Sequence, residues 1–280
     1  MKDWEKKRLQ YASFQKIDQS QPWFEVYDIG HDIIAIYEPY HFQEVISYLI
    51  LGQDKALLLD TGLGIGHMRR CVEEIYKGDY LVFNSHHHFD HILGDYLFND
   101  RLYVYDHQEM INALSKPLAS DYVKENFAPD QFADEAPIKS HEYVYHPISF
   151  QTVEEGHIFN LGRRRLKVIA TPGHAKDAIM LVDEENKLLF TGDTYYPAPL
   201  YCFEDTFDEY LLTMQKLAKQ YKDYLLVTSH NEPYRPGFKL VEVANGFMAI
   251  KNKKLLPSKD LGTRELYENE DFSLIKKKEV

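Results

Sequence analysis

The sequence predicts an α/β protein, and three observations support this prediction. Short apolar segments recur along the chain and are separated by polar or glycine-containing turns, a pattern typical of buried strands. Apolar residues at helical spacing separate some of them, as in segments 68–75 and 207–217. The chain has 280 residues, of which 44% are hydrophobic, so it can bury one large core.

The first half of the chain is expected to begin with antiparallel strands. Segments 23–29 and 33–38 flank Gly30-His31-Asp32, a hairpin turn signal, and strands at 45–51 and 56–59 follow. Asp60-Thr61-Gly62 then opens a glycine-rich turn before the predicted helix at 68–75. The apolar segment 80–83 completes a βαβ unit, and functional residues often cluster where such strands end.

The second half of the chain shows a similar succession of predicted strands and turns. A strand at 166–170 leads into Thr171-Pro172-Gly173-His174, and strands at 179–182 and 187–190 flank a polar turn. Thr206 and Glu209 have the spacing of a capping box, so a helix is expected to begin there. The last predicted strand, at 224–228, ends at Ser229-His230.

Composition shifts suggest the organisation of the chain. Residues 1–22 are expected to form an N-terminal extension, residues 23–255 one domain, and residues 256–280 a charged C-terminal tail. Within the domain, segment 106–147 carries four prolines and several aromatic residues among acids. Long connections are often lids or binding loops, so this insertion is expected to be either a lid or a helical surface decoration.

Charge and cysteine content narrow the classes of function. With 32 basic and 44 acidic residues the net charge is −12, which argues against nucleic acid as a partner. Cys71 and Cys202 lie in no paired motif and are expected to be buried thiols in a reducing compartment. No apolar leader or membrane-spanning run is present, so a cytoplasmic location without membrane contact is predicted. Whether the chain forms a homodimer stays open.

Histidine is the informative residue type, because four of the 13 lie within six positions. Potential metal ligands follow four predicted strands: His86, His88, Asp90 and His91 after the first, then His174, Asp193 and His230. If these strands lie side by side, their ends converge at one edge. Imidazole and carboxylate ligands without thiolates suit zinc, and also iron or manganese. Seven ligands exceed the needs of one tetrahedral ion, so two ions sharing an aspartate bridge are expected.

Other histidines are expected to be ordinary core or surface residues. His87 alternates out of the ligand set and is predicted to point away from the metals. The same interpretation applies to the histidines outside the strand ends: His31, His41, His67, His107, His141, His146 and His157.

These motifs resemble those of the metallo-β-lactamase-fold hydrolase superfamily over about residues 23–235. The resemblance rests on His86-x-His88-x-Asp90-His91, Thr171-Pro172-Gly173-His174, Gly192-Asp193, His230 and the upstream Asp60-Thr61-Gly62. It implies an αββα sandwich, in which two mixed sheets are flanked by helices and a dimetal site lies at one edge. It also implies ligand roles: His86, His88 and His174 for one metal, Asp90, His91 and His230 for the other, Asp193 as bridge and Asp60 as an orienting residue.

The sequence departs from this family pattern at two places. Ile92-Leu93-Gly94 follows the histidine motif where two glycines are common, and Ser229 precedes the last histidine where glycine is usual. Both departures concern packing around the ligands rather than the ligands themselves.

Within the superfamily the chain resembles glyoxalase II, the acyl-homoserine lactonases and the acyl-CoA thioesterases of this fold. Tyr196, three residues after Asp193, matches a tyrosine of the lactonases, and the segment 192–200 and the insertion resemble the thioesterases. The prediction is a dinuclear hydrolase that cleaves an acyl thioester, ester or lactone of a small molecule by attack of a metal-bridging hydroxide. Asp90 would pass a proton to the leaving group, and Tyr196 would stabilise the oxyanion. The expected substrate-binding residues are Tyr195, Tyr196, Tyr201, Phe203 and Phe42.

Two alternatives remain open. A phosphodiesterase or nuclease of the same fold would need basic residues near the site. The dense basic group Arg163-Arg164-Arg165 is expected to be the solvated start of a strand. A non-catalytic metal-binding protein would have an intact site with no open coordination position.

Overall fold

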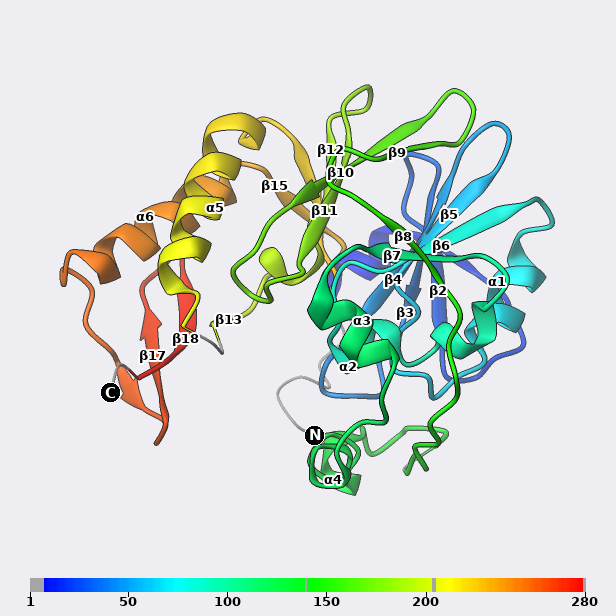
Figure 1. Cartoon of the computed structure of the whole chain (residues 1–280), viewed down its shortest axis with the longest axis horizontal. Coiled ribbons are helices and arrows are strands. Elements are labelled where there is room, and N and C mark those ends of the chain that lie inside the picture. Colours follow the sequence, from blue (N-terminus) through cyan, green and yellow to red (C-terminus); the bar gives the residue numbers. More distant parts are fainter. Residues whose placement is uncertain (1–7, 139, 203–204, 279–280) are drawn as a thin grey trace.

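The computed structural model describes residues 8–138, 140–202 and 205–278. Two β-sheets pack face to face, and helices cover both outer faces, with α1 and α3 on one side and α5 and α6 on the other (Figure 1). The predicted α/β class, with two mixed sheets flanked by helices, is confirmed.

The first sheet contains β1 to β8 in chain order. Strands β1 to β5 are antiparallel neighbours, whereas β5 to β8 pair in parallel. Helix α1 (Met68–Ile75) connects β5 to β6 and completes the predicted βαβ unit. The strands are β1 (Gln15–Ile17), β2 (Glu25–Asp28), β3 (Ile33–Tyr37), β4 (Ile46–Leu51), β5 (Ala56–Leu59), β6 (Tyr80–Phe83), β7 (Leu102–Tyr105) and β8 (Gln151–Val153).

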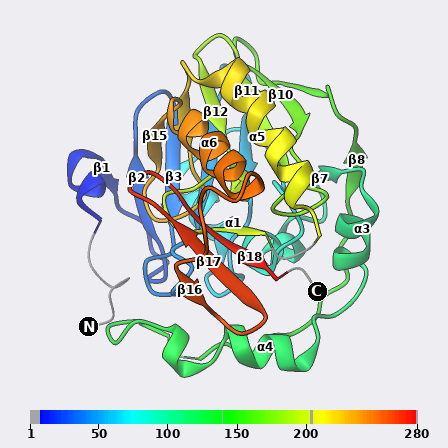
Figure 2. The same ribbon diagram turned by 90° about the vertical axis from the view of Figure 1, so that its left-hand side faces the viewer.

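The second sheet has the order β15-β14-β12-β11-β10-β9. Its neighbours are antiparallel except β12 and β14, which are parallel and are connected through α5 (Phe207–Tyr221). Helices α5 and α6 (Lys239–Lys251) cover its outer face (Figure 2). The strands are β9 (Ile158–Asn160), β10 (Arg165–Ala170), β11 (Ile179–Asp183), β12 (Leu188–Phe190), β14 (Leu225–Val227) and β15 (Tyr234–Pro236).

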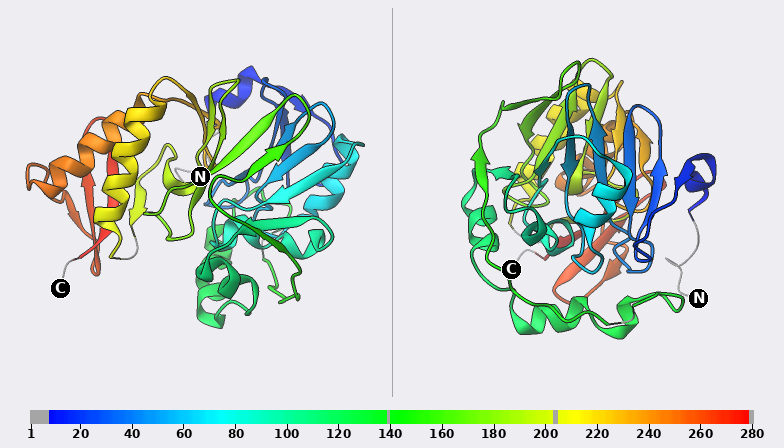
Figure 3. Two further views of the ribbon diagram at one scale, coloured as in Figure 1. Left: turned by 45° about the horizontal axis from the view of Figure 1, so that its top comes forward. Right: turned by 90° about the vertical axis from the view of Figure 1, so that its right-hand side faces the viewer.

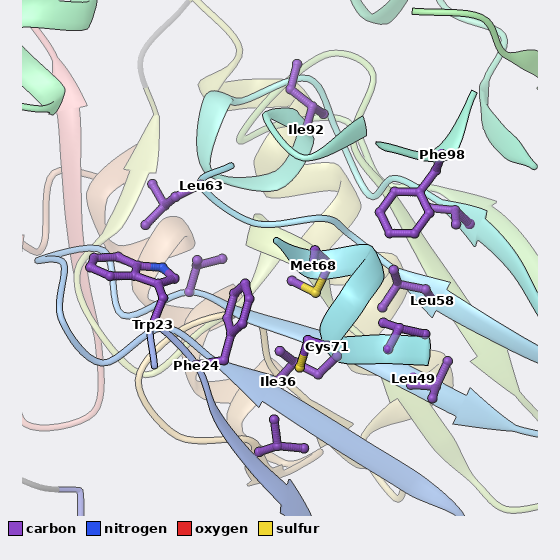
Figure 4. Packing of buried hydrophobic residues seen from close by; sticks show 14 of the residues in the cluster. Trp23, Phe24, Ile36, Leu49, Leu58, Leu63, Met68, Cys71, Ile92 and Phe98 are labelled. Atoms are coloured by element: carbon purple, nitrogen blue, oxygen red, sulfur yellow. The ribbon is translucent and has the colours of Figure 1, made fainter. Parts of the chain in front are cut away.

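Alternation along the strands divides the core into layers. In β3, Ile34 and Ile36 pack in the layer beneath α1, whereas Ile33 and Ala35 pack between the sheets. Figure 4 shows the first layer, where Met68 and Cys71 of α1 lie over strand residues such as Leu49 and Leu58. Strand β11 alternates likewise between the inter-sheet layer and the layer beneath α5 and α6. Both faces of these strands are buried in core layers, and this explains why their sequences are predominantly apolar.

The two terminal segments are more ordered than the sequence suggested. The expected charged tail contains β16 (Lys259–Asp260), β17 (Arg264–Glu268) and β18 (Ser273–Lys277), which form a third sheet with β13 (Leu200–Cys202). This sheet buries Tyr267, Phe272 and Leu274 in the core layer beneath α5 and α6. The prediction of a tail missed these strands because they are short and rich in charged residues. At the other end, η2 (Leu9–Ser13) buries Tyr11, and β1 extends the first sheet.

The insertion contains short helices, α3 (Gln108–Leu114), α4 (Ser120–Asn126) and η4 (Pro129–Gln131), before the chain returns to β8. Helix α4 and strand β17 both lie in the lower half of the molecule in Figures 1 and 2, and Figure 3 shows α4 projecting beyond the sheets. No helix in the described part of the chain is long and apolar enough to cross a membrane.

The predicted start of α5 is confirmed, because Thr206 is its N-cap residue, but the side-chain capping hydrogen bond is absent from the described part of the chain. The Thr206 hydroxyl donates instead to the backbone oxygen of Gly173 at 2.6 Å. The prediction for Arg164 was wrong. Arg164 is not solvated: its Nε donates to Asp183 Oδ2 at 2.7 Å and its Nη1 donates to the backbone oxygen of His31 at 2.9 Å. The buried guanidinium therefore joins the two sheets, a role that sequence spacing does not reveal.

Candidate metal centre

Every predicted ligand lies just beyond the carboxyl end of a strand. His86 and His88 follow β6, and Asp90 and His91 begin the short helix α2 (Phe89–Ile92). His174 follows β10, Asp193 lies in η5 (Gly192–Thr194) after β12, and His230 follows β14. Because these strand ends meet at one edge of the sandwich, residues far apart in the sequence come together there.

One cluster contains His86, His88, His174 and Asp193, whose ligand atoms all lie within 4.8 Å of one another. His88 Nδ1 is 3.0 Å from His86 Nε2 and 2.9 Å from His174 Nε2. His174 Nε2 is also 3.4 Å from Asp193 Oδ2. Three imidazole nitrogens and one carboxylate oxygen thus face a common point.

The second cluster contains Asp90, His91 and His230. The Nε2 atoms of His91 and His230 lie 3.8 and 3.7 Å from Asp90 Oδ2. They also lie 3.3 and 3.0 Å from Asp193 Oδ1. The two oxygens of Asp193 therefore face different clusters, which is the geometry that a bridging carboxylate requires.

Hydrogen bonds on the far side of the rings set their orientation. His91 Nδ1 bonds Asp60 Oδ2 at 2.8 Å, and His230 Nδ1 donates to the backbone oxygen of Gln43 at 2.6 Å. His174 Nδ1 similarly bonds the backbone oxygen of Tyr201 at 3.1 Å. Such bonds fix the tautomer and direct Nε2 inward.

Asp60 occupies the position of an orienting residue. Its φ of +64° belongs to the left-handed region. Its carboxylate is buried and also accepts hydrogen bonds from the Ser85 backbone nitrogen at 2.7 Å and the Ser85 hydroxyl at 2.8 Å. Asp60 thereby links the turn after β5 to the loop after β6 and to His91.

Electrostatics favour a cation at the centre. Burial lowers the pKa of His86 and His88 well below the usual range. Burial also lowers the pKa of His91, but the carboxylates of Asp193 and Asp90 outweigh it and raise that pKa well above its usual range. Burial raises the pKa of Asp193, but His230 and His91 outweigh it and hold that pKa well below its usual value. Paired carboxylates in a buried site thus require compensating positive charge.

A pair of divalent metal ions fits these residues. His91 Nε2 is buried and has no hydrogen-bond partner among the residues that the structure describes, although a buried polar atom without a partner is costly. The atom points to Asp193 Oδ1 and into the second cluster, where a metal would complete its bonding. The ligand chemistry, imidazole and carboxylate, suits zinc, iron or manganese equally.

Ser229, a departure from the family pattern, has a role that the sequence did not reveal. Its buried hydroxyl lies 2.7 Å from Asp193 Oδ1 and 2.8 Å from the backbone oxygen of Gly192. A glycine at this position would leave the bridging carboxylate without that contact. The sequence indicated only a change in packing at Ser229, because its contact with Asp193 joins residues that are far apart in the chain.

A pocket of about 510 Å³ opens over the ligands. Of the predicted substrate-binding residues, Phe42, Tyr196 and Tyr201 line it. Tyr195 does not line it: this side chain packs in the core and lines a neighbouring cavity, to which Tyr196 also contributes. Phe203 lies outside the described residues.

Two segments contribute pocket residues that the sequence interpretation did not include. Tyr122, Glu125 and Asn126 come from α4, so the insertion reaches the site, and Arg264 comes from β17. The Tyr122 ring packs edge-to-face on Phe89, with centroids 5.6 Å apart. Aromatic residues in the insertion were a signal for α4, whereas nothing in the sequence indicated Arg264.

Comparison with known proteins agrees with this geometry. The family model described as "Metallo-beta-lactamase superfamily" matches residues 44–230, which is more than half of the chain and ends at the last ligand. The chain belongs to the metallo-β-lactamase superfamily.

Several members of this superfamily are similar to it. The acyl-coenzyme A thioesterase MBLAC2 of Homo sapiens is 26% identical over 196 residues, covering 64% of this chain and 68% of that protein. The hydroxyacylglutathione hydrolase of Brucella ovis is 30% identical over 152 residues, covering 53% of this chain and 47% of that protein. Among solved structures, the metallo-β-lactamase family protein TTHA1429 from Thermus thermophilus has a TM-score of 0.56 at 19% identity, covering 86% of this chain and 80% of that one.

Proposed function

We propose that the protein is a dinuclear metal-dependent hydrolase that cleaves an acyl thioester, ester or lactone. The observation that carries this proposal is the Asp193 carboxylate, whose oxygens face two separate ligand clusters at the base of one pocket. His86, His88 and His174 would hold one ion, and Asp90, His91 and His230 the other. Bound divalent ions would supply Lewis-acid charge and water that ionises near neutral pH. Zinc is the proposed metal.

Asp90 and Tyr196 are the proposed proton-handling residues. Both line the pocket at the ligand clusters, where Asp90 is placed to carry a proton to a leaving alkoxide or thiolate. Burial raises the pKa of Tyr196 well above its usual value, so its hydroxyl remains a donor. That hydroxyl donates to the backbone oxygen of Pro199 at 3.2 Å, and it would exchange this partner for the acyl oxygen as negative charge develops there.

A thioester with a large anionic thiol is the favoured substrate class. The two curated relatives are named as a thioesterase and a hydroxyacylglutathione hydrolase. Arg264 is the one lysine or arginine among the described residues that line the pocket, and it offers a cation for an anionic group. Arg164, which a nuclease could have used to bind phosphate, is bonded to Asp183 between the sheets. We therefore place phosphodiester hydrolysis second, and we propose a small-molecule substrate and a cytoplasmic location.

A matched substrate panel tests this function. Purified, metal-loaded protein would be assayed with one acyl group on coenzyme A, on glutathione and on uncharged N-acetylcysteamine, together with a lactone and an aryl phosphodiester. Turnover of the anionic thioesters above the uncharged one is expected, and Arg264→Ala should reduce that preference about tenfold. Phosphodiester turnover without acyl turnover would overturn the proposal. Elemental analysis of the same sample identifies the metal.

A further inference from the structure

The three histidines of the first cluster come from two loops that are distant in sequence. One loop follows β6 and carries His86 and His88, and the other follows β10 and carries His174. The loops approach each other beside these ligands, where the Ile179 backbone nitrogen donates to the backbone oxygen of Ser85 at 2.9 Å. A second contact joins them two residues further along the first loop, between His87 Nδ1 and Asp177 Oδ1 at 2.7 Å.

This second contact is not an ordinary surface ion pair. Asp177 is fully buried, and within the described part of the chain its Oδ2 has no hydrogen-bond partner. Burying a carboxylate is expensive unless it is paired, so a fold that places one here depends on the contact with His87. The His87 side chain is 24% exposed and the Asp177 side chain 0%, so the contact pairs a buried carboxylate with a partly exposed imidazole.

We infer that the His87–Asp177 pair is a positioning brace for the first metal cluster. His87 is the residue between ligands His86 and His88, and Asp177 lies three residues after ligand His174. Closing the pair holds the two loops at the separation where His88 Nδ1 lies 3.0 Å from His86 Nε2 and 2.9 Å from His174 Nε2. This inference rests on the proposed metal centre and adds residues outside its ligand set.

The brace acts selectively because the second cluster has its own supports. His91 is held by Asp60 and His230 by the backbone of Gln43, neither of which contacts His87 or Asp177 through a hydrogen bond. Loss of the brace should therefore weaken metal binding by His86, His88 and His174 and leave binding by Asp90, His91 and His230 unchanged.

A third metal site is the competing interpretation of the same residues. Glu109 brings a carboxylate within 4.8 Å of ligand atoms on His87 and Asp177. However, the Lys176 ammonium lies 3.4 Å from Glu109 Oε1, so positive charge already accompanies this carboxylate. The direct His87–Asp177 contact explains the burial of Asp177 without an ion.

Site-resolved metal release tests the brace. His87→Ala, Asp177→Asn, Asp177→Ala and the double variant His87→Ala/Asp177→Ala would be loaded with Co²⁺ and titrated with a chelator while the visible spectrum is followed. His174→Ala and His230→Ala serve as references for loss of the first and the second ion. One equivalent of Co²⁺ should leave about tenfold more readily in the brace variants, with the spectral change seen in His174→Ala. The double variant should match the more affected single variant, because both remove one interaction.

Three results would overturn the inference. In the first, the brace variants release both ions at the same chelator concentrations as wild type and differ only in a lower melting temperature, which means that the pair only stabilises the fold. The second is equal weakening of both ions. The third is binding of three ions per wild-type chain and two in Asp177→Asn, which identifies a third metal site. Glu109→Gln is the matched control and should release both ions as wild type does. Two tightly held ions without acyl hydrolysis would refute the proposed function but leave the brace intact.

Discussion

The floor and the walls of the pocket differ in how they are built. The floor consists of the seven candidate ligand side chains, which follow the ends of four strands and are held by surrounding hydrogen bonds; five of them line the pocket directly. The walls include Tyr122, Glu125 and Asn126 of α4 and Arg264 of β17, which come from the insertion and the C-terminal sheet. His91 and Asp193 of the floor are 0% and 6% exposed, whereas Tyr122 is 39% exposed. This difference suggests that the floor sets the reaction class and the walls set the choice of substrate.

The largest effect is expected from the floor. Asp193→Ala removes the carboxylate that faces both clusters, so at least one metal ion should be lost. Hydrolytic activity should fall by at least about 10³-fold, because the ions supply both the nucleophile and charge stabilisation. Elemental analysis and initial rates on the same preparation measure the two losses together.

Glu125→Gln is the matched control for this substitution, since it removes the charge of a wall carboxylate in the same pocket. It should retain both ions and most of the activity. An Asp193→Ala protein that keeps two ions per chain would show that the carboxylate is not a bridge, and the distinction between floor and walls would fail.

The floor could be predicted from the sequence because each ligand combines a reactive residue type with a strand end. The apolar segment Tyr80–Phe83 locates His86 and His88, and short strands locate His174 and His230 in the same way. The αββα arrangement itself came from the resemblance rather than from periodicity. Ser229 was recognisable only as a departure, since its bond to Asp193 depends on two loops meeting.

The walls could not be predicted, because their positions depend on how distant segments pack. Tyr122 belongs to a segment identified as an insertion, but its place over the site depends on contact with Phe89. Arg264 belongs to a strand in which charged residues flank two apolar ones, so this segment was predicted to be a charged tail. The prediction for Arg164 was wrong in the opposite sense. The cluster of three arginines suggested solvent exposure, but Arg164 is buried and links the two sheets.

An intermediate effect is expected from the wall. Tyr122→Ala removes an aromatic side chain from the pocket without touching a ligand, so KM for acyl substrates should rise about tenfold while kcat changes less than about twofold. Steady-state kinetics with two acyl chain lengths would measure the change, which should be larger for the longer chain.

Tyr145→Ala is a matched control for this wall residue. Tyr145 lies in the same insertion and has a similar exposure, 36% against 39%, but it does not line the pocket. Its loss should leave both kinetic constants near their wild-type values. If Tyr122→Ala instead lowered kcat and metal content with KM unchanged, the wall would be part of the catalytic floor.

The smallest effect concerns how the wall is attached to the domain. His41 is fully buried, and its Nε2 bonds the backbone oxygen of Asn126, at the end of α4, at 2.8 Å. Burial lowers the pKa of His41 from 6.5 to about 4, against the opposing effect of this hydrogen bond. The folded protein therefore keeps His41 neutral at pH values where the unfolded chain is protonated. Its contribution to stability is complete above about pH 6.5 and is lost as pH falls toward 4.

Lowering the pH from about 6.5 to about 5.5 should cost about 1 kcal/mol of unfolding free energy through His41 alone. Denaturant unfolding of wild type and His41→Gln across this range isolates the contribution, because the other titrating groups are common to both proteins. The variant should be less stable at neutral pH and lose less stability on acidification. If the free energies of unfolding of wild type and His41→Gln fell in parallel as the pH is lowered, His41 would not be the source of this pH dependence. If the two profiles converged, the contact between His41 and α4 would be one that acid weakens independently of the metal ligands.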